Sequence, residues 1–217
     1  MKTKIQYLFA IVLLTFTLSF SFAQKSYVIK YEMVYDAPGL DAAMKAQLPS
    51  EMTMYIKGNK MMQESKSSMG TQSAIYDGDT KSSIVLIDMM GQQLAIKVGK
   101  EEIEKQLTEM PKVTVDLFDE TKKIAGYTCK KAEITEGDNT FTVFYTSDLG
   151  VSDINWATEF KDIKGVMMEY STSQQEMTVK FTAKEVKEQK IKDKQFTIPS
   201  GYKELTPEEA KKMFGGE

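Results

Sequence analysis

Residues 51–60 read EMTMYIKGNK, and the pattern of this stretch recurs along most of the chain. Met52, Met54 and Ile56 alternate with polar or amphipathic residues, so they share one face of an extended strand. The Gly-Asn pair that follows is typical of a hairpin turn, and a second alternating segment begins at Lys60. The stretch therefore predicts two antiparallel strands with one buried face.

The same period of two recurs through most of the chain between residues 26 and 202, with Gly, Asn or Asp turns between short segments. Four segments have helical spacing instead, and they comprise residues 40–48, 100–110 and 153–163 and a terminal helix that Thr206 caps. We expect a mainly β fold: a strongly curved antiparallel sheet, or half-barrel, with two or three helices on its concave side.

The N-terminus has the order of a signal peptide. Lys2 and Lys4 precede an apolar run over residues 7–22, and small residues lead to an expected cleavage between Ala23 and Gln24. The run is shorter than the roughly 20 residues that a membrane span needs. We expect an exported, periplasmic or secreted protein, with residues 1–23 removed and residues 24–217 forming one soluble domain that does not span a membrane.

Composition excludes several functional classes. The chain has no histidine and no arginine, and its net charge is −3. Without histidine there is no Ser-His or Cys-His dyad and no imidazole zinc site, so we predict no catalytic residues. Because the chain has no arginine and a negative net charge, we predict no nucleic-acid binding. No cofactor motif is present, and none is expected.

The only cysteine is Cys129, which lies far from the expected cleavage point, so we predict that the protein is not lipidated. A lone cysteine forms no internal disulfide. We interpret Cys129 as a small buried apolar residue, with a reactive thiol as the alternative.

The fifteen methionines admit two interpretations. Thioethers bind monovalent copper, but adjacent methionines on a strand face opposite sides, and only Met52 and Met54 share a face. Flexible thioethers also fill irregular apolar space. We therefore expect core or cavity-lining methionines and no metal site.

Four motifs, in this order, carry a family resemblance: YEM at 31–33, MYIKG at 54–58, IAGYTCK at 124–130 and IPSGY at 198–202. Together they resemble the exported domain-of-unknown-function 4412 family, which is similar in architecture to the LolA/LolB-type lipoprotein carriers. The resemblance implies a curved sheet that wraps around helices and leaves an apolar cavity. The carriers use an arginine to hold a lid shut, and this chain has none.

The leading hypothesis is a non-enzymatic protein that binds an acyl chain or other apolar ligand in a half-barrel cavity. The candidate lining residues are Met52, Met54, Ile56, Ile84, Leu86, Phe141, Val143 and Tyr145. The alternative is an envelope structural or protein-interaction module with a filled core, which recognises a partner, such as an envelope protein, through a sheet edge or through Trp156 and its helix. An enzyme is the third hypothesis.

Overall fold

The computed structural model describes residues 25–174 and 176–214. The predicted signal peptide and its cleavage between Ala23 and Gln24 lie outside the described residues. Among the helices of the described part, none is both long and apolar enough to cross a bilayer.

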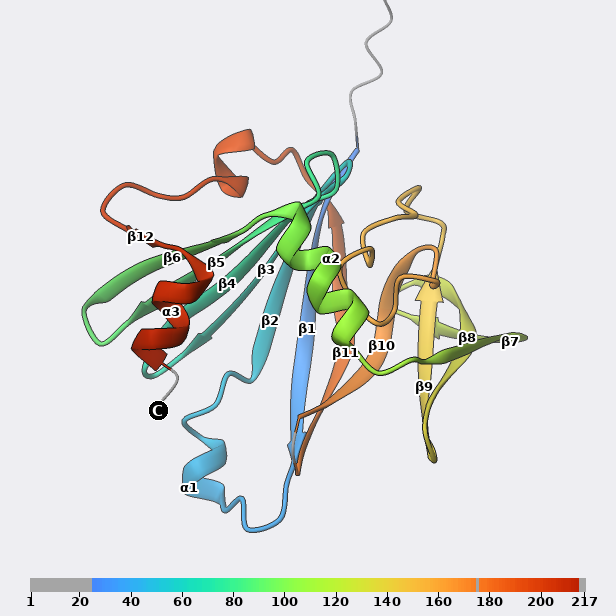
Figure 1. The fold of residues 1–217 in the computed structure, drawn as a ribbon. Helices are drawn as coiled ribbons and strands as arrows, with labels where there is room; N and C mark the ends of the chain where they lie inside the picture. The colour runs from blue at the N-terminus through green and yellow to red at the C-terminus, as the bar shows by residue number, and fades with distance from the viewer. Residues whose placement is uncertain (1–24, 175, 215–217) are drawn as a thin grey trace, which may run out of the picture.

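One sheet of 12 strands dominates the structure, in the order β12-β6-β5-β4-β3-β2-β1-β11-β10-β9-β8-β7 (Figure 1). The strands are β1 (Ser26–Asp36), β2 (Glu51–Lys57), β3 (Lys60–Ser67), β4 (Gly70–Asp77), β5 (Ser82–Met89), β6 (Gln92–Val98), β7 (Thr114–Ile124), β8 (Tyr127–Glu136), β9 (Asn139–Thr146), β10 (Val166–Gln174), β11 (Met177–Glu188) and β12 (Lys203–Leu205).

Two antiparallel meanders make up this sheet. Strands β1 to β6 form the first and β7 to β11 the second, and β1 joins them because it pairs with both β2 and β11. Short hairpin turns join most neighbours within each meander, whereas residues 37–50 join β1 to β2 and residues 147–165 join β9 to β10. β12 adds in parallel to β6. The edges are therefore β7 and the short β12.

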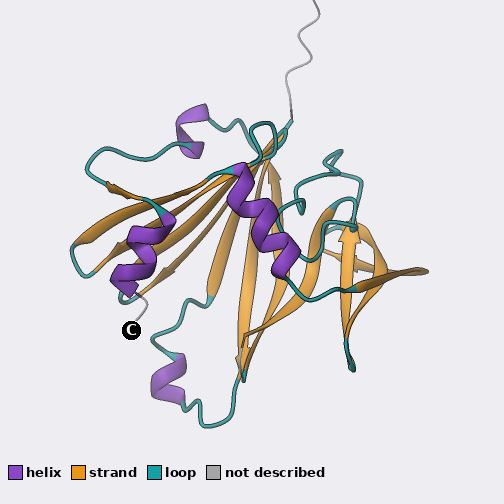
Figure 2. Ribbon diagram, in the orientation of Figure 1, coloured by secondary structure: helices purple, strands orange, loops and turns teal. Residues whose placement is uncertain are grey.

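Helices are few (Figure 2). They are α1 (Ala42–Lys45), α2 (Lys100–Glu109), the 3-10 turn η1 (Asp193–Phe196) and α3 (Pro207–Phe214). Helix α2 follows β6 and lies in front of the sheet in the view of Figure 1. The prediction of a mainly β fold, with a curved antiparallel sheet and few helices, is confirmed.

The terminal helix begins as its sequence predicts. Thr206 Oγ1 accepts a hydrogen bond of 3.2 Å from the amide of Glu209, and the Glu209 carboxylate accepts one of 2.8 Å from the Thr206 amide. This reciprocal pair is a capping box, which satisfies two amides that the helix itself leaves free.

The helix expected over residues 153–163 is wrong, because this segment forms irregular turns. Asn155 Nδ2 donates hydrogen bonds to the carbonyls of Ile163 and Gly165, at 2.8 and 3.0 Å, and these fold the segment back on itself. Trp156, Phe160 and Ile163 are all buried nevertheless. The spacing therefore predicted their burial correctly, although the backbone forms separate turns with hydrogen bonds between residues three apart instead of a helix.

Buried residues form two clusters on opposite faces of the first meander. The main cluster includes Met54, and the second includes Met62, which Ile191 and Phe196 cover. Ile56 pairs with Met61 across β2 and β3, so Met61 faces the main cluster and its neighbour Met62 faces the second. Residues 189–202 thus close one face, while residues 149–163 pack against the other.

Candidate functional site

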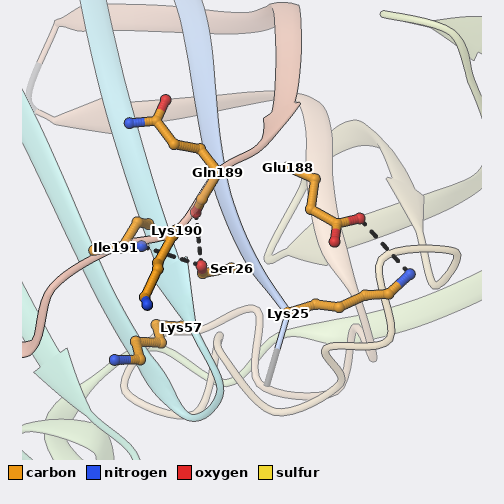
Figure 3. Close-up of a pocket in the computed structure, with 7 residues that line it drawn as sticks. All are labelled: Lys25, Ser26, Lys57, Glu188, Gln189, Lys190 and Ile191. Atoms are coloured by element: carbon orange, nitrogen blue, oxygen red, sulfur yellow. Dashed lines mark hydrogen bonds and ion pairs between the residues drawn. The ribbon is translucent and has the colours of Figure 1, made fainter. Parts of the chain in front are cut away.

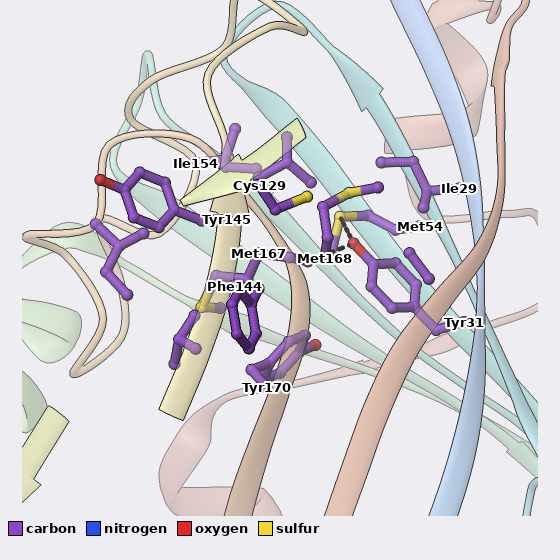
Figure 4. Packing of buried hydrophobic residues seen from close by; sticks show 14 of the residues in the cluster. Ile29, Tyr31, Met54, Cys129, Phe144, Tyr145, Ile154, Met167, Met168 and Tyr170 are labelled. Carbon is purple, nitrogen blue, oxygen red and sulfur yellow. Dashed lines mark hydrogen bonds between the residues drawn. The ribbon is translucent and has the colours of Figure 1, made fainter. Parts of the chain in front are cut away.

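The three predicted lining residues on β2 are packed inside the main cluster. Met52, Met54 and Ile56 are 5%, 2% and 0% exposed. Beside them, the hydroxyl of Tyr31 donates to the Met167 carbonyl at 2.8 Å and lies 3.9 Å from Met54 Sδ (Figure 4). Burial holds the pKa of Tyr31 well above its ordinary value. These contacts describe a filled core at this position.

The other five predicted lining residues lie in different surroundings. Ile84 and Leu86 pack with the second cluster, on the opposite face of the sheet from Met54. Val143 and Tyr145 belong to the main cluster, whereas Phe141 is half-buried and belongs to neither. The structure therefore does not bring the eight residues around one common space.

A hollow of about 300 Å³ lies beside helix α2 instead. Its lining residues are Lys81, Lys100, Ile103, Glu104, Leu107 and Trp156. The four on α2 have the spacing i, i+3, i+4 and i+7, which places them on one face of the helix. The helical spacing of these four residues is visible in the sequence. Only the fold brings helix α2 and Trp156 together.

Trp156 is the distinctive residue of this hollow. Its side chain is 9% exposed, and its Nε1 has no hydrogen-bond partner among the described residues. A buried N–H group without an acceptor is unfavourable and uncommon in folded proteins. Trp156 therefore has a buried N–H donor without an acceptor, and its side chain lines the hollow.

Lys81 covers the indole ring of Trp156, with its Nζ 4.7 Å from the ring centroid. The same ammonium group lies 3.2 Å from the carboxylate of Asp153. Lys81 has a φ of 54°, a left-handed conformation that costs a non-glycine residue about 1–2 kcal/mol. A strained backbone thus presents a cation to the face of the tryptophan.

Gly78, in the turn between β4 and β5, approaches the indole from another direction. A Cβ atom at this position would lie 3.5 Å from Trp156 Nε1 and only 2.8 Å from the Asn59 carbonyl oxygen. The turn therefore requires glycine for close backbone packing, and Nε1 faces this turn.

Charges around the hollow are paired but exposed to solvent. Asp153 contacts Lys81 and also Lys164, which lies 3.3 Å away, and Lys100 lies 3.7 Å from Glu104. Although partial desolvation opposes it, the hydrogen bonds from Lys81 and Lys164 lower the pKa of Asp153. The arrangement combines cations, an aromatic face, an unused N–H donor and two aliphatic side chains, which suits binding.

Another hollow, of about 460 Å³, lies where β1 begins and β11 ends (Figure 3). Ser26 holds this region together, because its hydroxyl donates to the Gln189 carbonyl at 2.6 Å and accepts from the Ile191 amide at 3.3 Å. Lys25 and Glu188 form a pair of 3.7 Å across its mouth. None of its lining residues is aromatic, and Ile191 is the only one with an aliphatic side chain, so its lining includes fewer apolar residues than that of the hollow beside α2.

Across the described ranges, no group of three or more Cys, Asp or Glu side chains is arranged to hold a metal ion. Cys129 is fully buried, and burial raises the pKa of its thiol to about 11. The prediction of a buried cysteine is confirmed.

Comparisons with known proteins identify the family of this chain and a solved structure with a similar fold. Residues 47–206 match the family model described as N-glycanase peptide, N-terminal domain. Two crystal forms of PNGF-II have a similar fold, with TM-scores of 0.53 and 0.55 at 17% and 16% sequence identity. The similarity covers 84% and 87% of this chain, but only 31% and 33% of PNGF-II, so the chain spans about a third of that protein. No curated protein sequence matches the chain.

Proposed function

Because the chain belongs to the family of N-glycanase N-terminal domains, of which its residues 47–206 match the model, we propose that it is a non-enzymatic binding domain. It binds an acyl chain or another apolar group in the hollow beside α2, on the concave side of the half-barrel. The observation that carries the proposal is Trp156: its buried indole lines a space that Ile103 and Leu107 also line.

The absence of catalytic activity is part of the proposal. The chain has no histidine, its thiol is buried, and it spans about a third of the length of PNGF-II. A glycosidase needs two carboxyl groups facing each other across a cleft. Asp153 and Glu104 beside the hollow are each paired with lysine, which supports a binding role rather than acid catalysis.

Location outside the cytoplasm is proposed as well. It rests on the signal-peptide pattern of residues 1–23 and on the position of Cys129, which offers no lipidation site at the expected cleavage point. The resemblance to domain-of-unknown-function 4412 proteins and to LolA/LolB-type carriers supports the same ligand class. The binding site that we propose is the hollow beside α2, in place of the space expected around Met52 and Met54.

Native mass spectrometry and lipid extraction of the protein purified from its own host test this function. We expect a co-purified apolar molecule, and we expect Leu107→Gln to reduce its retention because Leu107 lines the hollow and is only half-buried. Leu117→Gln is the matched control, since Leu117 is 61% exposed on strand β7 and does not line the hollow. A protein that carries no ligand and binds no apolar fluorescent probe contradicts the proposal.

A protein-interaction module with a filled core is the second candidate. It is favoured by the closed packing of Met52, Met54 and Ile56 and by the free edge of β7, where Leu117 and Phe118 are 61% and 39% exposed. An irregularity in the pairing between Leu117 and Thr121 interrupts this edge, however, and such bulges discourage strand addition. A ligand-free protein that captures a partner through β7 would favour this candidate over the first.

A further inference from the structure

The hollow beside α2 offers more than apolar contact. Of its six lining residues, Lys81 and Lys100 carry ammonium groups. At about 300 Å³ it lies at the lower end of ligand-pocket sizes, so it holds a small molecule or one end of a larger one. A purely apolar ligand would interact with neither ammonium group.

The two lysines are held only loosely by their present partners. Lys81 and Asp153 have side chains that are 37% and 51% exposed, and Lys100 and Glu104 are 60% and 62% exposed. Exposed ion pairs of this kind contribute little and rearrange readily. The ammonium groups are thus free to turn toward a bound anion.

The local balance of charge also favours an anion. Asp153, which does not line the hollow, contacts both Lys81 and Lys164. The charged residues that line the hollow are Lys81, Lys100 and Glu104, which leaves one positive charge in excess. This contrasts with the acidic balance of the chain as a whole. An oxygen-bearing anion would gain charge-assisted hydrogen bonds here.

Trp156 supplies the third contact. The exposed side chain of Lys81 covers its indole face, while its Nε1 is buried beside Gly78. When Lys81 turns to meet an anion, its movement uncovers the indole face for the apolar part of the ligand. The strained left-handed backbone of Lys81 is a further sign that this residue has a functional position.

We propose that the ligand of this hollow is an anionic amphiphile, whose carboxylate or phosphate head lies between Lys81 and Lys100 while its apolar end contacts Ile103, Leu107 and the indole of Trp156. The inference rests on the proposed function and specifies its ligand class.

Trp156 is the only tryptophan, so its fluorescence reports directly on this site. The full protein is titrated with decanoate, decyl phosphate and decanol, and calorimetry checks each affinity. We expect at least one anion to bind about tenfold or more tightly than decanol, because charge-assisted hydrogen bonds hold only the anions. The tighter of the two anions identifies the head group as carboxylate or phosphate.

The double variant Lys81→Gln/Lys100→Gln separates head from tail. Its preference for the anions should fall to about twofold or less, with decanol binding unchanged. Lys184→Gln/Lys187→Gln is the control, since it removes the same charge from side chains on β11 that are 54% and 61% exposed. This control should retain the full preference.

Two results overturn the inference in different ways. If decanol binds as tightly as both anions, or if the double variant keeps the preference for anions, the head-group assignment is wrong and the apolar-ligand function stands. If none of the three compounds changes the fluorescence or produces heat, both the inference and the proposed function are wrong.

Discussion

The carboxylate of Glu169 on β10 accepts hydrogen bonds of 2.9 and 3.1 Å from Lys122 Nζ on β7, although β8 and β9 lie between them in the sheet. Three strand spacings would separate these strands by about 14 Å in a flat sheet, with side chains perpendicular to it. The contact therefore requires the second meander to curl strongly. Lys180 on β11 lies 3.5 Å from the same carboxylate, so Glu169 joins three strands.

Glu169 should make the stability of the protein depend on pH. Although desolvation opposes it, the hydrogen bond from Lys122 and the charge of Lys180 lower the pKa of Glu169. A lowered pKa in the folded state means that ionised Glu169 stabilises the fold above its ordinary pKa, and that this contribution is lost as the pH falls through the folded value. Urea unfolding at pH 7 should show a loss of about 1–2 kcal/mol in Glu169→Gln.

The difference between Glu169→Gln and the parent should shrink in acid, because the parent carboxylate is then protonated. Glu188→Gln is the control, since Glu188 is 59% exposed and lies 3.7 Å from Lys25; it should change stability by less than about 0.5 kcal/mol. An equal effect of Glu169→Gln at pH 7 and in acid would show that the ion pair is not its cause.

Replacing both Met52 and Met54 with glutamine should destabilise the fold severely. Each substitution buries an amide without partners in the main cluster, at a cost of about 1–3 kcal/mol, which is a large part of a typical stability of about 5–15 kcal/mol. Thermal unfolding measures the loss. Met69→Gln/Met213→Gln is the control, because these methionines are 45% and 47% exposed. Near-parental melting of the Met52 and Met54 variant would instead indicate a cavity wall.

Cys129 should be unreactive in the folded protein. It is fully buried, and a thiol with a pKa of about 11 contains little thiolate at pH 8. A thiol reagent added at this pH should label the native protein slowly and label the unfolded protein rapidly. Fast stoichiometric labelling without denaturant would contradict the burial of Cys129.

Met90→Asn should stabilise the protein by about 0.5–1 kcal/mol. Met90 and Gly91 form the turn between β5 and β6 with φ values of 53° and 79°, a conformation that asparagine adopts more readily than methionine. Met90 is 90% exposed, so its side chain contributes little packing. Met69→Asn is the control at another turn, where φ is not positive; it should leave the urea midpoint unchanged, and an equal gain there would rule out the conformational explanation.

Most of the local structure follows from the sequence alone. Alternation predicted the strands around Met54, helical spacing predicted α2, and the cap residue Thr206 predicted the start of α3. These features depend on neighbours within a few residues, and the chain always brings such neighbours together. The lone Cys129 was also predicted to be buried, as the structure confirms.

Which faces coincide depends on the tertiary structure. Ile84 and Met54 each alternate correctly within their own strands, yet they face opposite sides of the sheet. The registers align Met54 with Gln63, Ala74 and Val85, and Val85 is the neighbour of Ile84. A change of one residue in the length of a turn moves every side chain of the next strand to the other face of the sheet. The sequence pattern does not fix the length of each turn. For the same reason, the meeting of Trp156 with α2, and of Lys122 with Glu169, depends on the long-range pairing and curvature of the whole sheet.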